Sequence, residues 1–236
     1  PAKEVDEPLP VSSETYGGPM RVVIVAAGDL AQSDARWLDD ADMLVAADGG
    51  ARALDELGRR PDLVIGDLDS AEPSLVDRLE AAGTRVERHP ADKDASDLEL
   101  ALLSAVDAGA DEIVLLGALG GARLDHELAN LLLLTDDTLA TCDVRIVRGG
   151  TTVRVLRGGD RLALSGGPGD LATLLPIGGD AAGVTTKGLH WPLEGATLRM
   201  GRSRGLSNSI ASLPASVSVE RGALLVVETS TEGSPS

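Results

Sequence analysis

Four short apolar runs, each ending in glycine or aspartate, constrain the fold more than any other feature of this sequence. Stretches with apolar residues at helical spacing lie between them. Fully apolar strands that alternate with helices indicate a parallel sheet covered on both faces. We therefore predict an α/β N-terminal domain with a mostly parallel, Rossmann-like sheet. The runs are RVVIVAAG (21–28), MLVAADGG (43–50), LVIGDLDS (63–70) and EIVLLGALGG (112–121).

The segments between these runs predict the helices of this domain. Residues 97–109 read DLELALLSAVDAG, with apolar residues at helical spacing and Gly109 as a stop signal. A short additional strand is expected near 84–88. The other expected helices are 31–40, 51–58, 72–82 and one running through HELANLLLLTDD (126–137).

The pattern changes after about residue 143. Short alternating or β-branched runs, broken by Gly-Gly and Gly-Asp turns, favour an antiparallel sandwich or barrel. We predict an α/β domain over 20–142 and an all-β sandwich domain over 143–230. Residues 1–19 and 231–236 show no apolar period and are predicted to be flexible tails.

Charge and cysteine content exclude several classes of function. The net charge of −17 argues against a protein that tracks nucleic-acid phosphates. The single cysteine, Cys142, excludes an intramolecular disulfide and provides no zinc cluster. No secretory apolar region and no membrane-spanning run is found, so a soluble cytoplasmic protein is expected.

Asp67 and Asp69 follow the third apolar run. Two side chains two residues apart on an extended segment point to the same side, so both carboxylates can hold one cation. Mg²⁺ prefers one or two carboxylates together with waters and phosphate oxygens. The alternative is that these aspartates form a turn or cap a helix.

A second acidic loop, Asp92-Lys93-Asp94-Ala95-Ser96-Asp97, precedes the helix 97–109. Ser96 fits an N-cap, with Glu99 completing a capping box. A capped helix N-terminus is also an anion site. Lys93 is either a positive charge beside a phosphate or a solvated surface lysine.

The fourth strand end carries Gly-Gly-Ala-Arg-Leu-Asp-His (120–126). Arg123 can bind a phosphate through two hydrogen bonds. Asp125 either accepts a proton from an attacking hydroxyl or caps the following helix. Positioning and the neutralisation of negative charge are what phosphoryl transfer needs, and these four loops together supply suitable groups.

Six segments, taken in order along the chain, resemble thiamine pyrophosphokinases. The resemblance implies an enzyme that transfers the β,γ-pyrophosphoryl group of ATP to the primary hydroxyl of thiamine, giving thiamine diphosphate and AMP. It also implies Mg²⁺ and a homodimer with its active site near the subunit interface. The segments are ADGGA (47–51), PDLVIGDLDS (61–70), KDASDLE (93–99), GGARLDHELANL (120–131), TTKGLHWPL (185–193) and GLSNS (205–209).

The resemblance assigns roles to individual residues. Asp67, Asp69 and Asp97 match the metal-linked aspartates, and Arg123 and Asp125 match the Gly-Gly-Arg-x-Asp-His element, here with Ala122 inserted. Either Asp125 or Asp97 is the base that takes the hydroxyl proton. The nucleotide side is assigned to Asp48, Gly49, Gly50, Ser70, Lys93, Asp94 and Ser96.

Trp191, Ser207 and Asn208 match the thiamine end of the family. A flat cationic ring favours an aromatic face, and tryptophan offers the best one. The alternative for Trp191 is a packing role in a chain without phenylalanine. Ser207 and Asn208 either bond the aminopyrimidine ring or form a turn.

Two other functions share parts of this pattern. Phosphatases of the haloacid-dehalogenase type also use Asp-x-Asp after a strand, a lysine and a later acidic pair, here Asp136 and Asp137. However, they place Asp-x-Asp after their first strand, and at least two strands are expected before Asp67. The other alternative is a non-enzymatic module that binds ATP and leaves it intact.

Overall fold

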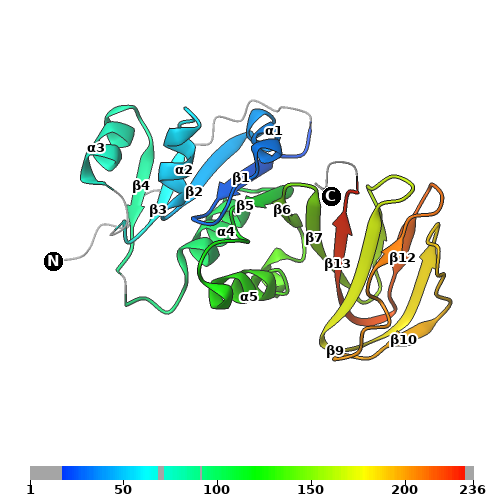
Figure 1. Cartoon of the computed structure of the whole chain (residues 1–236). Coiled ribbons are helices and arrows are strands. Elements are labelled where there is room, and N and C mark those ends of the chain that lie inside the picture. The colour runs from blue at the N-terminus through cyan, green and yellow to red at the C-terminus, as the bar shows by residue number, and fades with distance from the viewer. Residues whose placement is uncertain (1–17, 69–71, 91, 232–236) are drawn as a thin grey trace.

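A computed structural model describes residues 18–68, 72–90 and 92–231 (Figure 1). Strands and helices alternate in its first part, as the apolar runs predict. These elements are β1 (Arg21–Val25), η1 (Gln32–Ala35), α1 (Arg36–Asp39), β2 (Met43–Ala47), α2 (Gly50–Glu56), β3 (Leu63–Gly66), α3 (Pro73–Ala81), β4 (Arg85–Arg88), α4 (Asp97–Asp107), β5 (Glu112–Leu116), α5 (Leu124–Leu133), η2 (Asp137–Leu139) and β6 (Asp143–Arg148).

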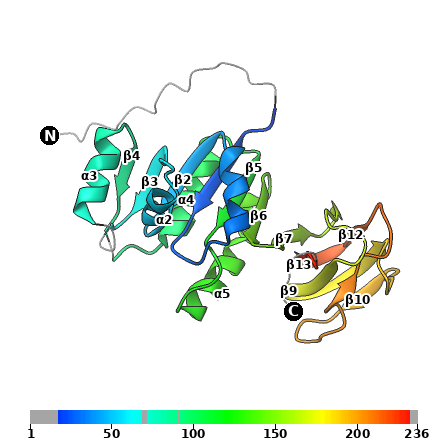
Figure 2. The same ribbon diagram turned by 45° about the horizontal axis from the view of Figure 1, so that its top comes forward.

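Six parallel strands form the sheet of this part in the order β4-β3-β2-β1-β5-β6. Alternate residues of each strand enter two different cores, because side chains of a strand point to opposite faces. Val22 and Ile24 of β1 pack in the core that α4 covers. Val23 and Val25 pack in the core that contains residues of α1, α2 and α3. Figures 1 and 2 show these helices on the two sides of the sheet.

The second part of the chain is β-rich. Its strands are β7 (Thr151–Arg157), β8 (Arg161–Ala163), β9 (Leu171–Lys187), β10 (Ala196–Leu198), β11 (Asn208–Ser209), β12 (Ser216–Ser218) and β13 (Arg221–Thr229). β13 pairs with β7 on one side and with β9 on the other, both antiparallel. β9 also pairs with β10, β11 and β12, so this one long strand connects the β-rich part.

The change from parallel to antiparallel pairing comes one strand later than the sequence predicted. β6 begins at Asp143 and is parallel to β5, while β7 is antiparallel to β6. The alternating pattern of β6 and the Gly-Gly turn after it favoured an antiparallel strand, but β6 pairs in parallel with β5, and Arg145 of β6 forms an ion pair with Glu112 of β5 at 3.0 Å. The hydrogen-bonded ladder therefore continues from β4 to β8 as a mixed sheet, and only its β4–β6 segment is parallel. The two-domain division at residue 142 stays a prediction.

The predicted tails fall mostly outside the described residues. Residues 1–17 and 232–236 are among those not described. Thr231, which the prediction placed in the C-terminal tail, donates its N–H to Asp170 Oδ1 at 2.8 Å and is held by the β-rich part. Within 18–68, 72–90 and 92–231, no helix is long and apolar enough to cross a bilayer.

Candidate active site

Asp48 and Asp67 lie at the adjoining carboxyl ends of β2 and β3. The N–H of Asp48 donates to the carbonyl of Ile65 at 2.8 Å. An added Cβ on Gly66 would lie 3.2 Å from Asp48 Cα, so the two strand ends are in close contact. Asp48 and Leu68 adopt positive φ angles of 46° and 60°, which non-glycine residues rarely do and which often mark a functional site.

Glycines let neighbouring backbones approach one another at this edge of the sheet. A Cβ on Gly50 would collide with the carbonyl oxygen of Val25, so α2 begins directly against the end of β1. A Cβ on Gly28 would collide with the carbonyl of Gly117, whose oxygen accepts the Gly28 N–H at 2.8 Å. β1 and β5 are neighbours although β2 to β4 separate them in the chain. Such a switch in strand order is where α/β sheets bind ligands.

The loop between β4 and α4 brings Lys93 and Asp97 together. Lys93 Nζ donates to Asp97 Oδ1, and their side chains are 15% and 21% exposed. Ser96 is the N-cap of α4, and its hydroxyl accepts the Glu99 N–H at 3.1 Å, as predicted. Lys93 is therefore paired with a carboxylate and is not a solvated surface lysine.

Arg123 and Asp125 form an exposed, two-bonded ion pair where α5 begins. Arg123 Nε and Nη2 donate to the two carboxylate oxygens at 2.9 and 2.6 Å. The hydrogen bonds from Arg123 lower the pKa of Asp125 to about 2. Asp125 does not cap α5, because Arg123 occupies the N-cap position and no side chain caps that end.

Trp191, Ser207 and Asn208 come together in the β-rich part. Trp191 is 59% exposed, and Asn208 is buried directly against the Trp191 backbone. Ser207 is exposed, adopts a φ of 57°, and donates its N–H to Thr173 Oγ1 at 2.9 Å. A packing role for Trp191 in the core of its own chain is excluded by this exposure.

The predicted site residues form two separate groups. The first lies at the carboxyl edge of the parallel strands and the second lies in the loops beside β9 and β11. The contacts given above for Trp191, Ser207 and Asn208 all lie within the β-rich part. Figure 1 shows β2 and β3 at the opposite end of the molecule from β9 and β10. Asp69 and Ser70 lie outside the described residues.

The donor set of the first group suits a hard cation such as Mg²⁺. Carboxylate oxygens are the ligands that Mg²⁺ prefers, and one or two of them suffice when phosphates supply the rest. Within the described residues, which leave out Asp69, no group of three or more histidines, cysteines or carboxylates is placed to hold a metal. Mg²⁺ usually keeps several waters and takes phosphate oxygens from its substrate, so it does not need a cage made of protein ligands alone.

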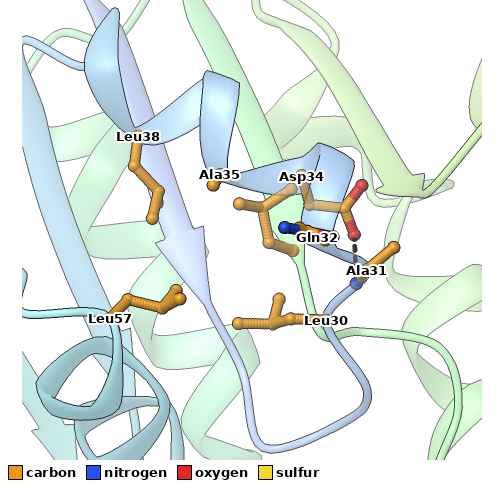
Figure 3. Close-up of a pocket in the computed structure, with 8 residues that line it drawn as sticks. Leu30, Ala31, Gln32, Asp34, Ala35, Leu38 and Leu57 are labelled. Carbon is orange, nitrogen blue, oxygen red and sulfur yellow. Dashed lines mark hydrogen bonds between the residues drawn. The ribbon is translucent and has the colours of Figure 1, made fainter.

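Sequence reasoning missed a buried carboxylate and a cavity beside the loop that follows β1. Asp34 is 1% exposed and accepts the N–H groups of Ala31 at 2.9 Å and Gly149 at 2.8 Å. It borders a largely apolar cavity of about 120 Å³ between η1, α1 and the end of α2 (Figure 3). The signal was an acid at the third position of a short helix, where it bonds back to the N-cap backbone.

Comparison with known proteins identifies the family. A model described as "Thiamin pyrophosphokinase, catalytic domain" matches residues 35–146, and "Thiamin pyrophosphokinase, vitamin B1 binding domain" matches residues 164–224. Thiamine pyrophosphokinase 3 of Oryza sativa subsp. japonica is 30% identical over 208 residues, covering 74% of this chain and 73% of the relative. The chain belongs to the thiamine pyrophosphokinase family.

Solved structures of thiamine pyrophosphokinases share this fold. The structure from Geobacillus thermodenitrificans is 30% identical, with a TM-score of 0.76, and covers 91% of this chain and 99% of its own. The structure from Bacillus subtilis has a TM-score of 0.80 at 24% identity, over 89% of this chain and 99% of that one. The phosphatase and ATP-sensing alternatives are not favoured. β1 and β2 precede the Asp67 strand, and Asp136 caps η2 and does not follow a strand.

Proposed function

We propose that this chain transfers the β,γ-pyrophosphoryl group of ATP to the primary hydroxyl of thiamine, giving thiamine diphosphate and AMP. One observation carries the proposal: the two thiamine pyrophosphokinase family models, the catalytic domain and the vitamin B1 binding domain, match successive parts of the chain. The catalytic part has an acidic, glycine-rich strand edge. The vitamin B1 binding part has an exposed tryptophan held beside Asn208.

In the reaction, the thiamine hydroxyl oxygen forms a bond to the β-phosphorus of ATP. The bond from that phosphorus to the oxygen bridging the α- and β-phosphates breaks, and AMP leaves with this oxygen. The hydroxyl proton passes to a protein base. Such transfers are accelerated mainly by positioning and by neutralising the phosphate charge.

We assign the phosphate side to the strand edge. Asp67, Asp69 and Asp97 would hold Mg²⁺, which when bound neutralises the charge on the phosphate oxygens. Arg123 would bind phosphate through the two N–H groups that now meet Asp125. The nucleotide contacts are assigned to Asp48, Gly49, Gly50, Ser70, Lys93, Asp94 and Ser96.

The pairing of Asp125 bears on the choice of base. A general base works best when its pKa lies near the working pH, and the pKa of Asp125 is about 2 while Arg123 bonds it. If Arg123 turned to a phosphate, Asp125 would lose the bonds that lower its pKa. Asp97 and Asp125 both remain candidates, and each is paired with a cation.

The decisive assay incubates the protein with ATP and Mg²⁺, with or without thiamine, and measures AMP. AMP that forms only with thiamine supports the proposal. Thiamine monophosphate serves as the control acceptor, because its hydroxyl is already esterified. AMP formation without thiamine would contradict the proposal, as would inorganic phosphate released from phosphomonoesters without ATP. ATP that binds but stays intact in every mixture would favour a sensing module.

We also propose a homodimer in the cytoplasm, with the Trp191 group of one copy facing the Asp67 group of the other. This arrangement accounts for the separation of the two groups within one chain. Co-expression of Asp67→Asn and Trp191→Ala chains tests it. A mixed dimer would retain one intact site, so the mixture should recover about a quarter of the normal rate at low thiamine. Activity no higher than the mean of the two variants would place both groups of a site in one chain.

A further inference from the structure

The Asn208 side chain holds the backbone of Trp191 at two points. Its Oδ1 accepts the Trp191 N–H at 3.1 Å, and its Nδ2 donates to the Trp191 carbonyl at 2.7 Å. The same Oδ1 accepts the Ser209 N–H at 2.9 Å. An amide side chain offers two N–H donors and two acceptor sites, so three of its four hydrogen-bonding positions are used within the protein.

Asn208 and Trp191 differ in how far they are exposed to solvent, and this difference indicates different roles. Asn208 is 8% exposed, whereas Trp191 is 59% exposed. A buried amide with internal partners has little capacity left for a ligand. An indole ring that projects into solvent from a fixed backbone is available to bind a ligand.

The neighbouring residues fasten the same loop to the same strand. Leu189 and Ile210 form an antiparallel bridge, and the His190 N–H donates to the Ser209 carbonyl at 2.9 Å. The His190 ring also packs edge-on against the indole, with centroids 4.7 Å apart and planes at 84°. The orientation of the indole is thus set by Asn208 through the backbone and by His190 through the ring.

From these contacts we infer that Asn208 is a positioning residue that acts on thiamine through Trp191, and not a ligand of the aminopyrimidine ring. The inference rests on the proposed function, because it takes thiamine as the flat cation that the indole meets. A ring that is ordered before binding avoids the entropy cost of being ordered by the ligand. Asn208 therefore contributes to thiamine affinity without touching thiamine.

A double-mutant cycle on the full-length enzyme separates the two roles. Asn208→Ala should raise the thiamine KM on the order of tenfold and leave the ATP KM unchanged. In a Trp191→Ala background, the same change should raise the thiamine KM little further, because its target is gone. If the two fold-changes instead multiply, Asn208 contacts thiamine directly and the inference is wrong.

Fluorescence tests the positioning step without any turnover. Trp37 and Trp191 are the only tryptophans, so Trp37→Phe leaves Trp191 as the single reporter. In that background, Asn208→Ala should lower the fluorescence anisotropy of Trp191 and increase its quenching by acrylamide. Unchanged values would overturn the inference even if the enzyme makes thiamine diphosphate. Changed values with no turnover would instead contradict only the proposed function.

Thr186→Val, a change in β9, provides a matched control that affects the same loop. Thr186 is buried, and its Oγ1 accepts the Leu193 N–H at 2.9 Å, so the variant also loses one side-chain bond to the loop backbone. It should lower the melting temperature and leave Trp191 anisotropy and the thiamine KM close to normal. An equal rise in KM for both variants would mean that Asn208 acts only through general loop stability. Asn208→Asp, which keeps the acceptor oxygen and loses the donor, replaces Asn208→Ala if that variant does not fold.

Discussion

At the scale of single residues, the candidate site is notable for cations that already have carboxylate partners. Lys93 bonds Asp97, and Arg123 bonds Asp125. In the proposed nucleotide site, the triphosphate must compete with these carboxylates for both cations. Exchange of one anion for another keeps each cation paired throughout, which limits the cost of desolvation.

The Arg123–Asp125 ion pair predicts a lowered pKa for Asp125 that a titration can measure. The pKa of Asp125 in the folded protein, about 2, lies below the ordinary value of 3.8 for an aspartate. The pair's contribution to stability is therefore present above pH 3.8 and lost as the pH falls through about 2. It should be small, because both side chains are about two-thirds exposed.

Arg123→Gln should return the Asp125 pKa toward 3.8, as followed by NMR titration of its carboxyl carbon. A pKa that stays near 2 in this variant would show that another group lowers it. Arg78→Gln is the matched control, since it breaks a similar exposed pair with Asp55 elsewhere on the surface.

Asp67→Asn should lower kcat by at least about a hundredfold, because it removes one negative charge from the proposed metal site. The far-UV circular dichroism spectrum should stay unchanged. Asp77→Asn, an exposed change on α3, should have a normal rate. A near-normal rate for Asp67→Asn would show that Asp67 is not part of the catalytic site.

At the scale of elements, α4 and α5 differ sharply in how they are held. Leu98, Ala101, Leu102 and Ala105 of α4 are buried against the sheet. None of the α5 residues is buried, and Leu124, Leu128 and Leu132 are exposed along one side at helical spacing. Leu131 and Leu133 of α5 are partly buried against the core. Both segments show apolar periodicity in the sequence, so periodicity alone does not reveal that one side of α5 is exposed.

This contrast predicts unequal costs for the same truncation. Leu102→Ala should reduce the free energy of unfolding by about 2–5 kcal/mol, because it leaves a cavity in the core. Leu128→Ala should change it by no more than about 0.5 kcal/mol. Urea denaturation at low protein concentration measures both. A large loss for Leu128→Ala would show that the exposed side of α5 is covered in solution.

Gly50 predicts a further element-scale effect. Gly50→Ala would drive a methyl group into the Val25 carbonyl and push α2 away from β1. The expected cost is about 1–3 kcal/mol of unfolding free energy, with weaker ATP binding by calorimetry. Gly18→Ala, where nothing lies within 4 Å of the added Cβ, should be neutral in both measurements. If the Gly50→Ala protein is destabilised but binds ATP with normal affinity, the position of α2 does not affect the nucleotide site.

At the scale of the whole molecule, a feature could be predicted from the sequence when the residues that form it lie close together in the chain. Local periodicity predicted the strands and helices of the first part, and the Ser96 cap was visible within four residues. The parallel pairing of β6 and the contact between Asn208 and Trp191 depend on partners that are 31 and 17 residues away in the chain. Such pairings leave no local signal, so the sequence could not show them.

The net charge of −17 predicts that salt stabilises the protein. Raising the KCl concentration from about 0.01 M to about 0.1 M shortens the Debye length from about 30 Å to about 10 Å and weakens repulsion between surface carboxylates. The melting temperature should rise by a few degrees. A variant combining Glu56→Gln, Asp107→Asn and Asp160→Asn should gain less from the same salt. An equal rise in melting temperature for the variant and the original protein would show that repulsion between surface carboxylates is not the cause.

The position of β13 has a consequence for how the protein is made. Arg221–Thr229 lies between β7 and β9, although both partners are synthesised well before it. On the ribosome, the β1–β6 strands can pair early, but β7 and β9 keep an open edge until the last described strand emerges. Open strand edges invite pairing with other chains. The interval before β13 arrives is therefore when a nascent chain is most exposed to aggregation, and when a chaperone would help it most.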